Sequence, residues 1–189
     1  MRLFIALTLP QTVRDALGAY QKELKQAIGR RVRWTAASHL HITLRFLGAA
    51  DASLVPALLA LIRRCAAGVP SIEAAWSPAL GAFPSVGAPR VLWAGLGAGA
   101  ETVCSVARQI EAGVIALGCP PEEHAFHPHV TLGRVRAPAE AAEVGRQLRA
   151  ITAPLDEAPF RLDTLALIES VLKPEGPIHT TLGTASLGT

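Results

Sequence analysis

The sequence predicts an α+β fold made of two related lobes, each a mainly antiparallel sheet with helices outside, around a central cleft. The motif HxHxTL occurs twice, beginning at His39 and at His127, which lie 88 residues apart in a chain of 189. Expected strands alternate with helices but also occur in adjacent pairs, a pattern typical of antiparallel sheets. With 50% hydrophobic and 17% charged residues, the chain is globular. We therefore expect a single bilobal domain over 1–189, with one HxTL motif per lobe at 41–44 and 129–132.

The first half of the chain offers clear signals for helix starts. Pro10 suits the first turn of a helix in which Val13 and Leu17 begin an apolar stripe at three- and four-residue spacing. Asp51 is a suitable cap for a second helix. The expected elements are, in order, a strand at 2–9, a helix at 11–28, strands at 32–34 and 39–48, and a helix at 52–65.

In the second half, Gly and Pro mark the boundaries. A Pro- and Gly-rich loop at 83–89 separates two apolar runs, Gly118 follows a long helical pattern, and Pro138 opens another. A turn is expected at 173–177. The expected elements are strands at 72–82 and 90–96, a helix at 100–117, a strand at 127–136, a helix at 138–150, and strands at 160–169 and 179–186.

Strand alternation places the polar side chains of each motif on one face and its apolar side chains on the other. We expect one face to carry His39, His41, Thr43 and Arg45 in the first copy and His127, His129 and Thr131 in the second. Arg134 would point away from Thr131 under strict alternation, and a bulge or bend at Gly133 would re-aim it. A single strand histidine is more often structural than catalytic, but the duplication favours a functional cleft.

Two histidines and two threonines suit chemistry at phosphorus. One neutral imidazole can accept a proton from a nucleophile while a protonated one donates to a leaving group. In-line displacement needs these groups on opposite sides of the phosphorus atom, which two related lobes would supply. Threonine hydroxyls can bind the non-bridging oxygens, and arginine adds charge.

Other interpretations of the motif remain open. An HxH strand can also present two ligands to zinc or iron, with a third ligand from Glu122, Glu123 or His124. The same cleft could also bind a phosphorylated ligand without turnover. By contrast, nothing like GxSxG is present, and the glycines near Gly95 lack the spacing of a dinucleotide loop.

The composition also bears on location and partners. Three cysteines at 65, 104 and 119 form no disulfide framework and suit a reducing compartment, so we expect a cytoplasmic protein. The apolar runs are shorter than a membrane span, so no membrane partner is expected. A net charge of +3 favours an anionic ligand only weakly. We expect a monomer.

The paired motifs His41-Ile-Thr-Leu44 and His129-Val-Thr-Leu132 resemble those of the two-histidine phosphoesterase superfamily. The flanking sequences resemble its RNA 2′,3′-cyclic phosphodiesterase branch, also called the 2′-5′ RNA ligase family. They are RLFIALTLP at the start, Val32-Arg-Trp34, Phe46-Leu-Gly48, Gly81-Ala-Phe-Pro84, Pro89-Arg-Val-Leu-Trp93, Phe126-His-Pro-His129, Arg134 and Glu169-Ser170.

The resemblance implies metal-independent hydrolysis of 2′,3′-cyclic phosphate ends of RNA or small nucleotides to 2′-phosphomonoesters, without a cofactor, and with reversible 2′-5′ RNA ligation as the reverse reaction. It makes His41 the proton donor and His129 the proton acceptor. Substrate would be bound by Thr43, Thr131, Arg134 and the aromatic ring of Phe126, and the shared strand face with His41 and Thr43 adds Arg45 as an expected substrate-binding residue. The alternative is a module that binds RNA ends or cyclic nucleotides without turnover. One departure is His179, which stands where the family often has a tyrosine.

Overall fold

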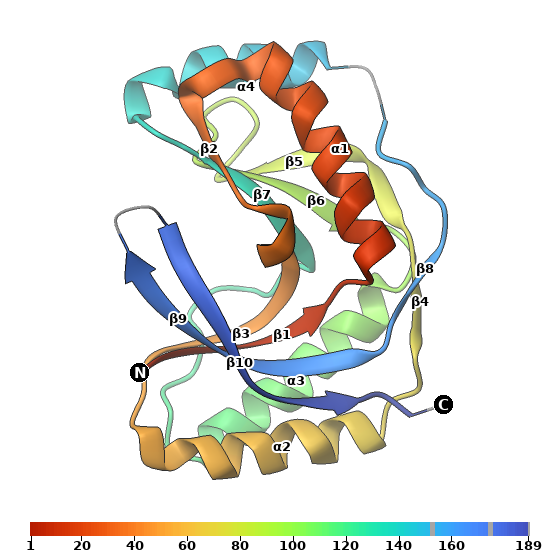
Figure 1. Ribbon diagram of the computed structural model, residues 1–189, viewed down its shortest axis with the longest axis vertical. Coiled ribbons are helices and arrows are strands. Elements are labelled where there is room, and N and C mark those ends of the chain that lie inside the picture. Colours follow the sequence, from red (N-terminus) through yellow and green to blue (C-terminus); the bar gives the residue numbers. More distant parts are fainter. Residues whose placement is uncertain (152–153, 174–175, 189) are drawn as a thin grey trace.

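The strands form one large and one small antiparallel sheet in the computed structural model, which describes residues 1–151, 154–173 and 176–188 (Figure 1). The small sheet pairs β4 (Ile72–Ala74) with β8 (Phe160–Leu162). The large sheet has eight strands in the order β10 (Gly176–Ser186), β9 (Thr164–Lys173), β1 (Arg2–Thr8), β3 (His41–Ala49), β7 (His129–Val135), β6 (Val91–Leu96) and β5 (Trp76–Phe83), with β2 (Val32–Trp34) paired to β7.

The two halves of the large sheet meet where β3 and β7 pair through a single couple of residues, Ile42 and Val130. The predicted α+β class with antiparallel strands is confirmed. We expected one sheet in each lobe, but the pairing of these two residues joins the strands of both halves into a single sheet. From this pair of residues the strands diverge, so that the ribbon has an opening between β2 and β7 on one side and β9 and β10 on the other (Figure 1).

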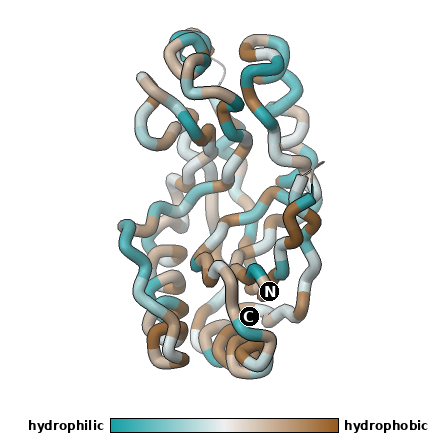
Figure 2. Tube along the Cα trace, turned by 90° about the vertical axis from the view of Figure 1, so that its left-hand side faces the viewer, coloured by the Kyte–Doolittle hydropathy of each residue, from teal (hydrophilic) through white to brown (hydrophobic). Residues whose placement is uncertain are grey.

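Each half of the sheet carries two helices. Helices α2 (Val55–Ala67) and α3 (Ala100–Ala116) pack on the half containing β1, β3, β9 and β10. Helices α1 (Gln11–Ile28) and α4 (Ala141–Ala150) cover the other half, where Ile28 and Val144 form a separate apolar cluster with Leu92. Figure 2 shows the two halves one above the other, with more hydrophilic residues on the upper helices than on α2.

Most predicted elements are present, and the differences have local causes. The predicted helix at 11–28 and strand at 32–34 are confirmed. The runs at 72–82 and 160–169 each divide into two strands that belong to different sheets. The helix expected at 52 begins as a 3₁₀ turn, Ala52–Leu54, in which the Asp51 carboxylate accepts from the Ser53 amide. The centre of the turn expected at 173–177 lies outside the described residues.

Both first histidines of the repeated motif lie outside their expected strands. His39 ends the 3₁₀ helix Ala37–His39, and β7 begins only at His129. The prediction that His39 and His127 continue the strand faces is therefore wrong. Among the described residues, no helix is long and apolar enough to cross a membrane.

Candidate active site

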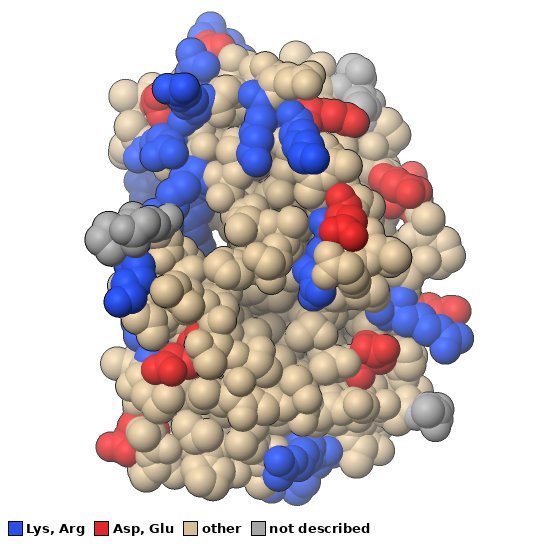
Figure 3. Space-filling model, viewed as in Figure 1, with Lys and Arg blue, Asp and Glu red and all other residues tan. Residues whose placement is uncertain are grey.

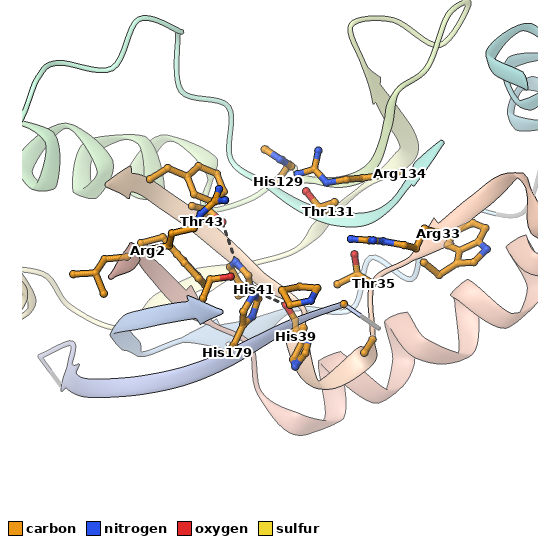
Figure 4. A pocket seen from close by; sticks show the side chains of 18 of the residues that line it. Arg2, Arg33, Thr35, His39, His41, Thr43, His129, Thr131, Arg134 and His179 are labelled. Carbon is orange, nitrogen blue, oxygen red and sulfur yellow. Dashed lines mark hydrogen bonds between the residues drawn. The ribbon is translucent and has the colours of Figure 1, made fainter. Parts of the chain in front are cut away.

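A cavity of about 420 Å³ lies at the seam between the two halves of the sheet (Figure 4). None of the described residues that line it is acidic, which makes the cavity suited to an anion. Its polar lining side chains are Arg2, Arg33, Thr35, His39, His41, Thr43, His129, Thr131, Arg134, Ser170 and His179.

The motif histidines and threonines come together because of the register at the seam. Pairing of Ile42 with Val130 sets His41 opposite Thr131 and Thr43 opposite His129 in antiparallel strands. Both central residues of the seam are fully buried, so alternation turns the four polar side chains to the cavity. Each histidine therefore has a threonine two residues on and another across the seam.

His41 is held by two hydrogen bonds within its own segment. Its Nδ1 lies 2.6 Å from the carbonyl oxygen of His39, which can only accept, so Nδ1 carries the hydrogen. Nε2 of the neutral ring is then an acceptor, and the Thr43 hydroxyl donates to it at 2.9 Å (Figure 4). The ring also stacks on Phe4, with centroids 4.8 Å apart. These contacts fix which nitrogen is available for proton transfer.

His129 is oriented in the same way. Its Nδ1 donates to the His127 carbonyl at 2.7 Å, which leaves Nε2 as the second ring nitrogen. Its ring stands edge-on to Phe83, with centroids 5.1 Å apart, and Trp93 lies beside it. A side chain at Gly81 would overlap the Trp93 ring, with a Cβ 2.1 Å from it, so glycine there lets the indole lie against the sheet.

Burial keeps both rings neutral at physiological pH in the absence of a ligand. It lowers the pKa of His41 from 6.5 to about 4, against the opposing effect of the His39 carbonyl, and the charges of nearby histidines add to the lowering. Burial also lowers the pKa of His129, with further contributions from the charges of His127 and Arg134. A bound anion acts in the opposite direction on both rings.

A β-bulge occurs at the same place in each motif strand. In β3, Ile5 pairs with Arg45 and Ala6 with Thr43, so Leu44 is the extra residue. In β7, Leu92 pairs with Gly133 and Trp93 with Thr131, so Leu132 is the extra residue. Burial runs identically along 41–46 and 129–134, with the two residues after each threonine buried and the third exposed. The bulge therefore changes the side of the sheet to which the side chain five residues after His41, and five after His129, points.

This bulge decides which arginine reaches the cavity. Arg134 lines it, as the predicted bend near Gly133 would require. The equivalent position in β3 is Phe46, which also lines the cavity with 57% of its side chain exposed. Sequence reasoning missed Phe46 as a site residue because strict alternation places it on the core face.

The prediction that Arg45 binds substrate is wrong in this structure. The bulge turns Arg45 to the buried side of β3, where only 8% of it is exposed. There its guanidinium forms ion pairs with Glu111 at 2.5 Å and Glu122 at 3.0 Å, and it donates to the carbonyls of Pro120 and Phe46. Arg45 thus joins β3 to α3 and to the segment that follows it.

Phe126 does not line the cavity, contrary to the prediction that its ring contacts substrate. It is partly buried and packs against the main apolar core. The aromatic rings that do border the cavity are Phe4 and Phe46 from one half and Trp34 from the other.

The additional histidines have distinct environments. The backbone carbonyls of His39 and His127 orient the rings of His41 and His129, and the side chains of His39 and His127 take no part in these contacts. The His39 ring lies 4.6 Å from that of His179, and both line the cavity, whereas the His127 ring packs on Trp93. Burial and the neighbouring His39 lower the pKa of His179. Among the described residues, no three His, Cys, Asp or Glu side chains are arranged to hold a metal ion.

Gln21 connects α1 to the bulge in β7. Its side chain is buried, and its amide donates to the Leu132 carbonyl at 2.8 Å and the Thr35 carbonyl at 2.9 Å. Because Leu132 is the bulge residue, this contact fixes the backbone that directs Arg134. A lone glutamine in a helix carried no sequence signal for this role.

Comparisons with known proteins identify the family. The family model of the 2′-5′ RNA ligase superfamily matches residues 9–173. The chain belongs to this superfamily. The resemblance inferred from the two HxTL motifs is thereby confirmed.

Members of the superfamily match over nearly the whole chain. An RNA 2′,3′-cyclic phosphodiesterase of Thermus thermophilus is 35% identical, over 99% of this chain and 90% of the relative. A crystal structure of a Thermus thermophilus protein superposes with a TM-score of 0.81 at 34% identity, covering 99% of this chain and 98% of the other. Escherichia coli LigT complexed with 3′-AMP has a TM-score of 0.78 at 25% identity, covering 100% and 98%.

Proposed function

We propose that this protein is an RNA 2′,3′-cyclic phosphodiesterase, which hydrolyses 2′,3′-cyclic phosphate ends to 2′-phosphomonoesters without a metal. The observation that carries the proposal is the pair His41 and His129, which face one cavity from adjoining strands, each with Nδ1 held by a carbonyl. The name of the Thermus thermophilus relative supports the substrate class. The lack of acidic residues among the described lining suits a phosphodiester anion.

The threonines and Arg134 bind the phosphate. Thr43 and Thr131 line the same cavity from the two strands that meet at the seam, so hydroxyls from both halves reach one phosphate group. Arg134 adds a permanent charge, and its planar guanidinium suits two oxygens of the group at once. The exposed ring of Phe46 offers a face on which the nucleobase stacks.

Proton transfer runs through the two Nε2 atoms. Nε2 of His129 takes a proton from water as the water oxygen bonds to phosphorus. The bond between phosphorus and the 3′ oxygen breaks, and that oxygen receives the proton from Nε2 of protonated His41. The product carries a 2′-phosphate and a 3′-hydroxyl, and the protons return to their starting places through solvent. Each role typically contributes about 10² to 10⁴ in rate.

The bound substrate itself prepares His41 as the acid. The negative charge of the phosphodiester raises the pKa of His41 above the value of about 4 that burial gives it. The carbonyl of His39 stabilises the charged ring, since it accepts from Nδ1 in either protonation state. The ring therefore gains its proton when the leaving group that needs it is in place.

Hydrolysis of a 2′,3′-cyclic nucleotide in the presence of EDTA tests this function. We expect turnover that the chelator does not reduce, with all of the product phosphate on the 2′ oxygen. Binding of a 2′-phosphorylated nucleotide without any hydrolysis would identify a binding module instead. Activity lost with EDTA and restored by zinc would identify a metal-dependent hydrolase.

The same groups permit the reverse reaction, in which a 5′-hydroxyl replaces water and a 2′-5′ linkage forms. Ligation is expected only at high concentrations of RNA ends, where the hydroxyl competes with water. All the groups named above come from one chain, so we propose a monomeric enzyme, which light scattering can test. Three free cysteines support a cytoplasmic location.

A further inference from the structure

A second groove of about 410 Å³ lies beside the catalytic cavity. The two share Arg33 and Trp34 in their linings, so the groove adjoins the cavity at β2. The described residues that line it are Lys25, Gly29, Arg30, Val32, Arg33, Trp34 and Arg136. Four of these are basic and none is acidic. In Figure 3, Lys and Arg side chains gather beside the hollow, over the region of β2 and the end of β7.

The basic side chains of this groove have no acidic partners among the residues that the structure describes. Among the described residues, no Asp or Glu lies within ion-pair distance of Arg30, Arg33 or Arg136. All three are exposed, so each charge faces solvent. Lys25 has a separate structural explanation, because it lies in the last turn of α1, where a cation is favoured.

The strand pairing brings like charges together. Arg33 of β2 pairs directly with Arg134 of β7, and like charges at opposed positions destabilise a sheet. Arg136 follows the end of β7 and lines the same groove as Arg33, and its amide donates to the Arg31 carbonyl next to Arg30. A polyanion that lies along this face would offset the repulsion.

We infer that this groove binds the backbone phosphates of single-stranded RNA that precede the terminal cyclic phosphate. The inference rests on the proposed function, because it places the cyclic phosphate between the two histidines and the rest of the strand over β2. Arg33, shared by the two hollows, meets the first phosphate upstream, and Arg30 and Arg136 meet those further along. The preferred substrate is then an RNA end of several nucleotides and not a free cyclic mononucleotide.

Paired substrates separate this inference from the catalytic proposal. One is a 2′,3′-cyclic mononucleotide, and the other is a five-nucleotide single strand with the same cyclic end. The test variant is Arg30→Gln/Arg136→Gln, since neither residue lines the catalytic cavity. The matched control, Arg63→Gln/Arg64→Gln, removes two exposed charges from α2 on the other half.

The test variant is expected to lose about tenfold in kcat/KM on the oligonucleotide, from two exposed charge contacts, while mononucleotide turnover stays within about twofold. Its kcat/KM on the oligonucleotide should also fall less steeply with salt, by about 1.4 in the log–log slope for two single-strand phosphate contacts. The control should match the wild type on both substrates.

An equal effect on both substrates, or an equal loss in the control, would overturn the inference, as would unchanged oligonucleotide kinetics. If neither substrate is hydrolysed, the catalytic proposal fails, and fluorescence anisotropy with a labelled 2′-phosphorylated oligonucleotide still decides the inference. Weaker binding in the test variant alone then supports it, and identical binding in all three proteins refutes it.

Discussion

Replacing His41 by glutamine is expected to make the protein less sensitive to acid. Burial lowers the pKa of His41 from 6.5 to about 4, so the unfolded chain takes up a proton that the folded chain resists. This group therefore leaves stability intact above about pH 6.5 and reduces it as the pH falls towards 4. The glutamine side chain has no charge in this range and cannot contribute such a loss.

The size of the effect follows from the two pKa values. The interval between 6.5 and about 4, at about 1.4 kcal/mol for each pH unit, corresponds to about 3 kcal/mol when the loss is complete. At pH 4.5, where the folded protein begins to bind the proton, the loss is about 2.5 kcal/mol. This is a large part of the stability of a small domain, which is typically about 5–15 kcal/mol.

Urea unfolding at pH 7.5 and pH 4.5, followed by tryptophan fluorescence, measures the difference. The decrease in unfolding free energy between the two pH values should be about 2.5 kcal/mol smaller in His41→Gln than in the wild type. His124→Gln is the control, because that histidine is 86% exposed, and it should behave as the wild type. An undiminished decrease in His41→Gln would refute the assignment of a strongly lowered pKa to this ring.

Three further predictions concern residues around the site. Arg45→Met should lower the unfolding free energy by about 2–4 kcal/mol, since it leaves Glu111 and Glu122 without their cation, yet preserve kcat of the folded enzyme; lost kcat at normal stability would contradict the structural role. Phe46→Ala should raise KM for a cyclic nucleotide about tenfold through lost stacking, with stability unchanged, whereas Phe46→Tyr should retain the wild-type KM. Gln21→Leu should lower the unfolding free energy by about 1–3 kcal/mol and slow turnover, because the Leu132 carbonyl keeps only the Thr35 amide as donor and the Thr35 carbonyl loses its bond to Gln21; a normal kcat would show that Gln21 does not control the position of Arg134.

Local sequence patterns predicted the parts of the fold that local interactions determine. The helix over 11–28 follows Pro10 and an apolar stripe whose Leu17, Leu24 and Ile28 are buried. The duplicated motif placed His41, Thr43, His129 and Thr131 on cavity-facing sides of two strands, and the register at the seam brings them together.

What the sequence did not reveal depends on contacts between distant segments. The bulge after each threonine reverses the faces of the following residues, and alternation alone therefore assigned Arg45 to the cavity and Phe46 to the core. The acidic partners of Arg45 come from α3 and the segment after it, so no local pattern pairs them. Arg33 reaches the cavity because β2 pairs with β7, a contact between strands about a hundred residues apart in the chain.

The pH dependence of kcat/KM for the two histidine variants tests the central claim most directly. Both pKa values are lowered, so the wild-type profile should be bell-shaped with an alkaline limb that begins below pH 6.5. His41→Ala should retain low activity that no longer falls at high pH, because the acid whose deprotonation causes that limb is gone. His129→Ala should retain low activity that no longer falls at low pH. Loss of the same limb in both variants, or of the opposite limb in each, would contradict the assignment of His41 as proton donor and His129 as proton acceptor.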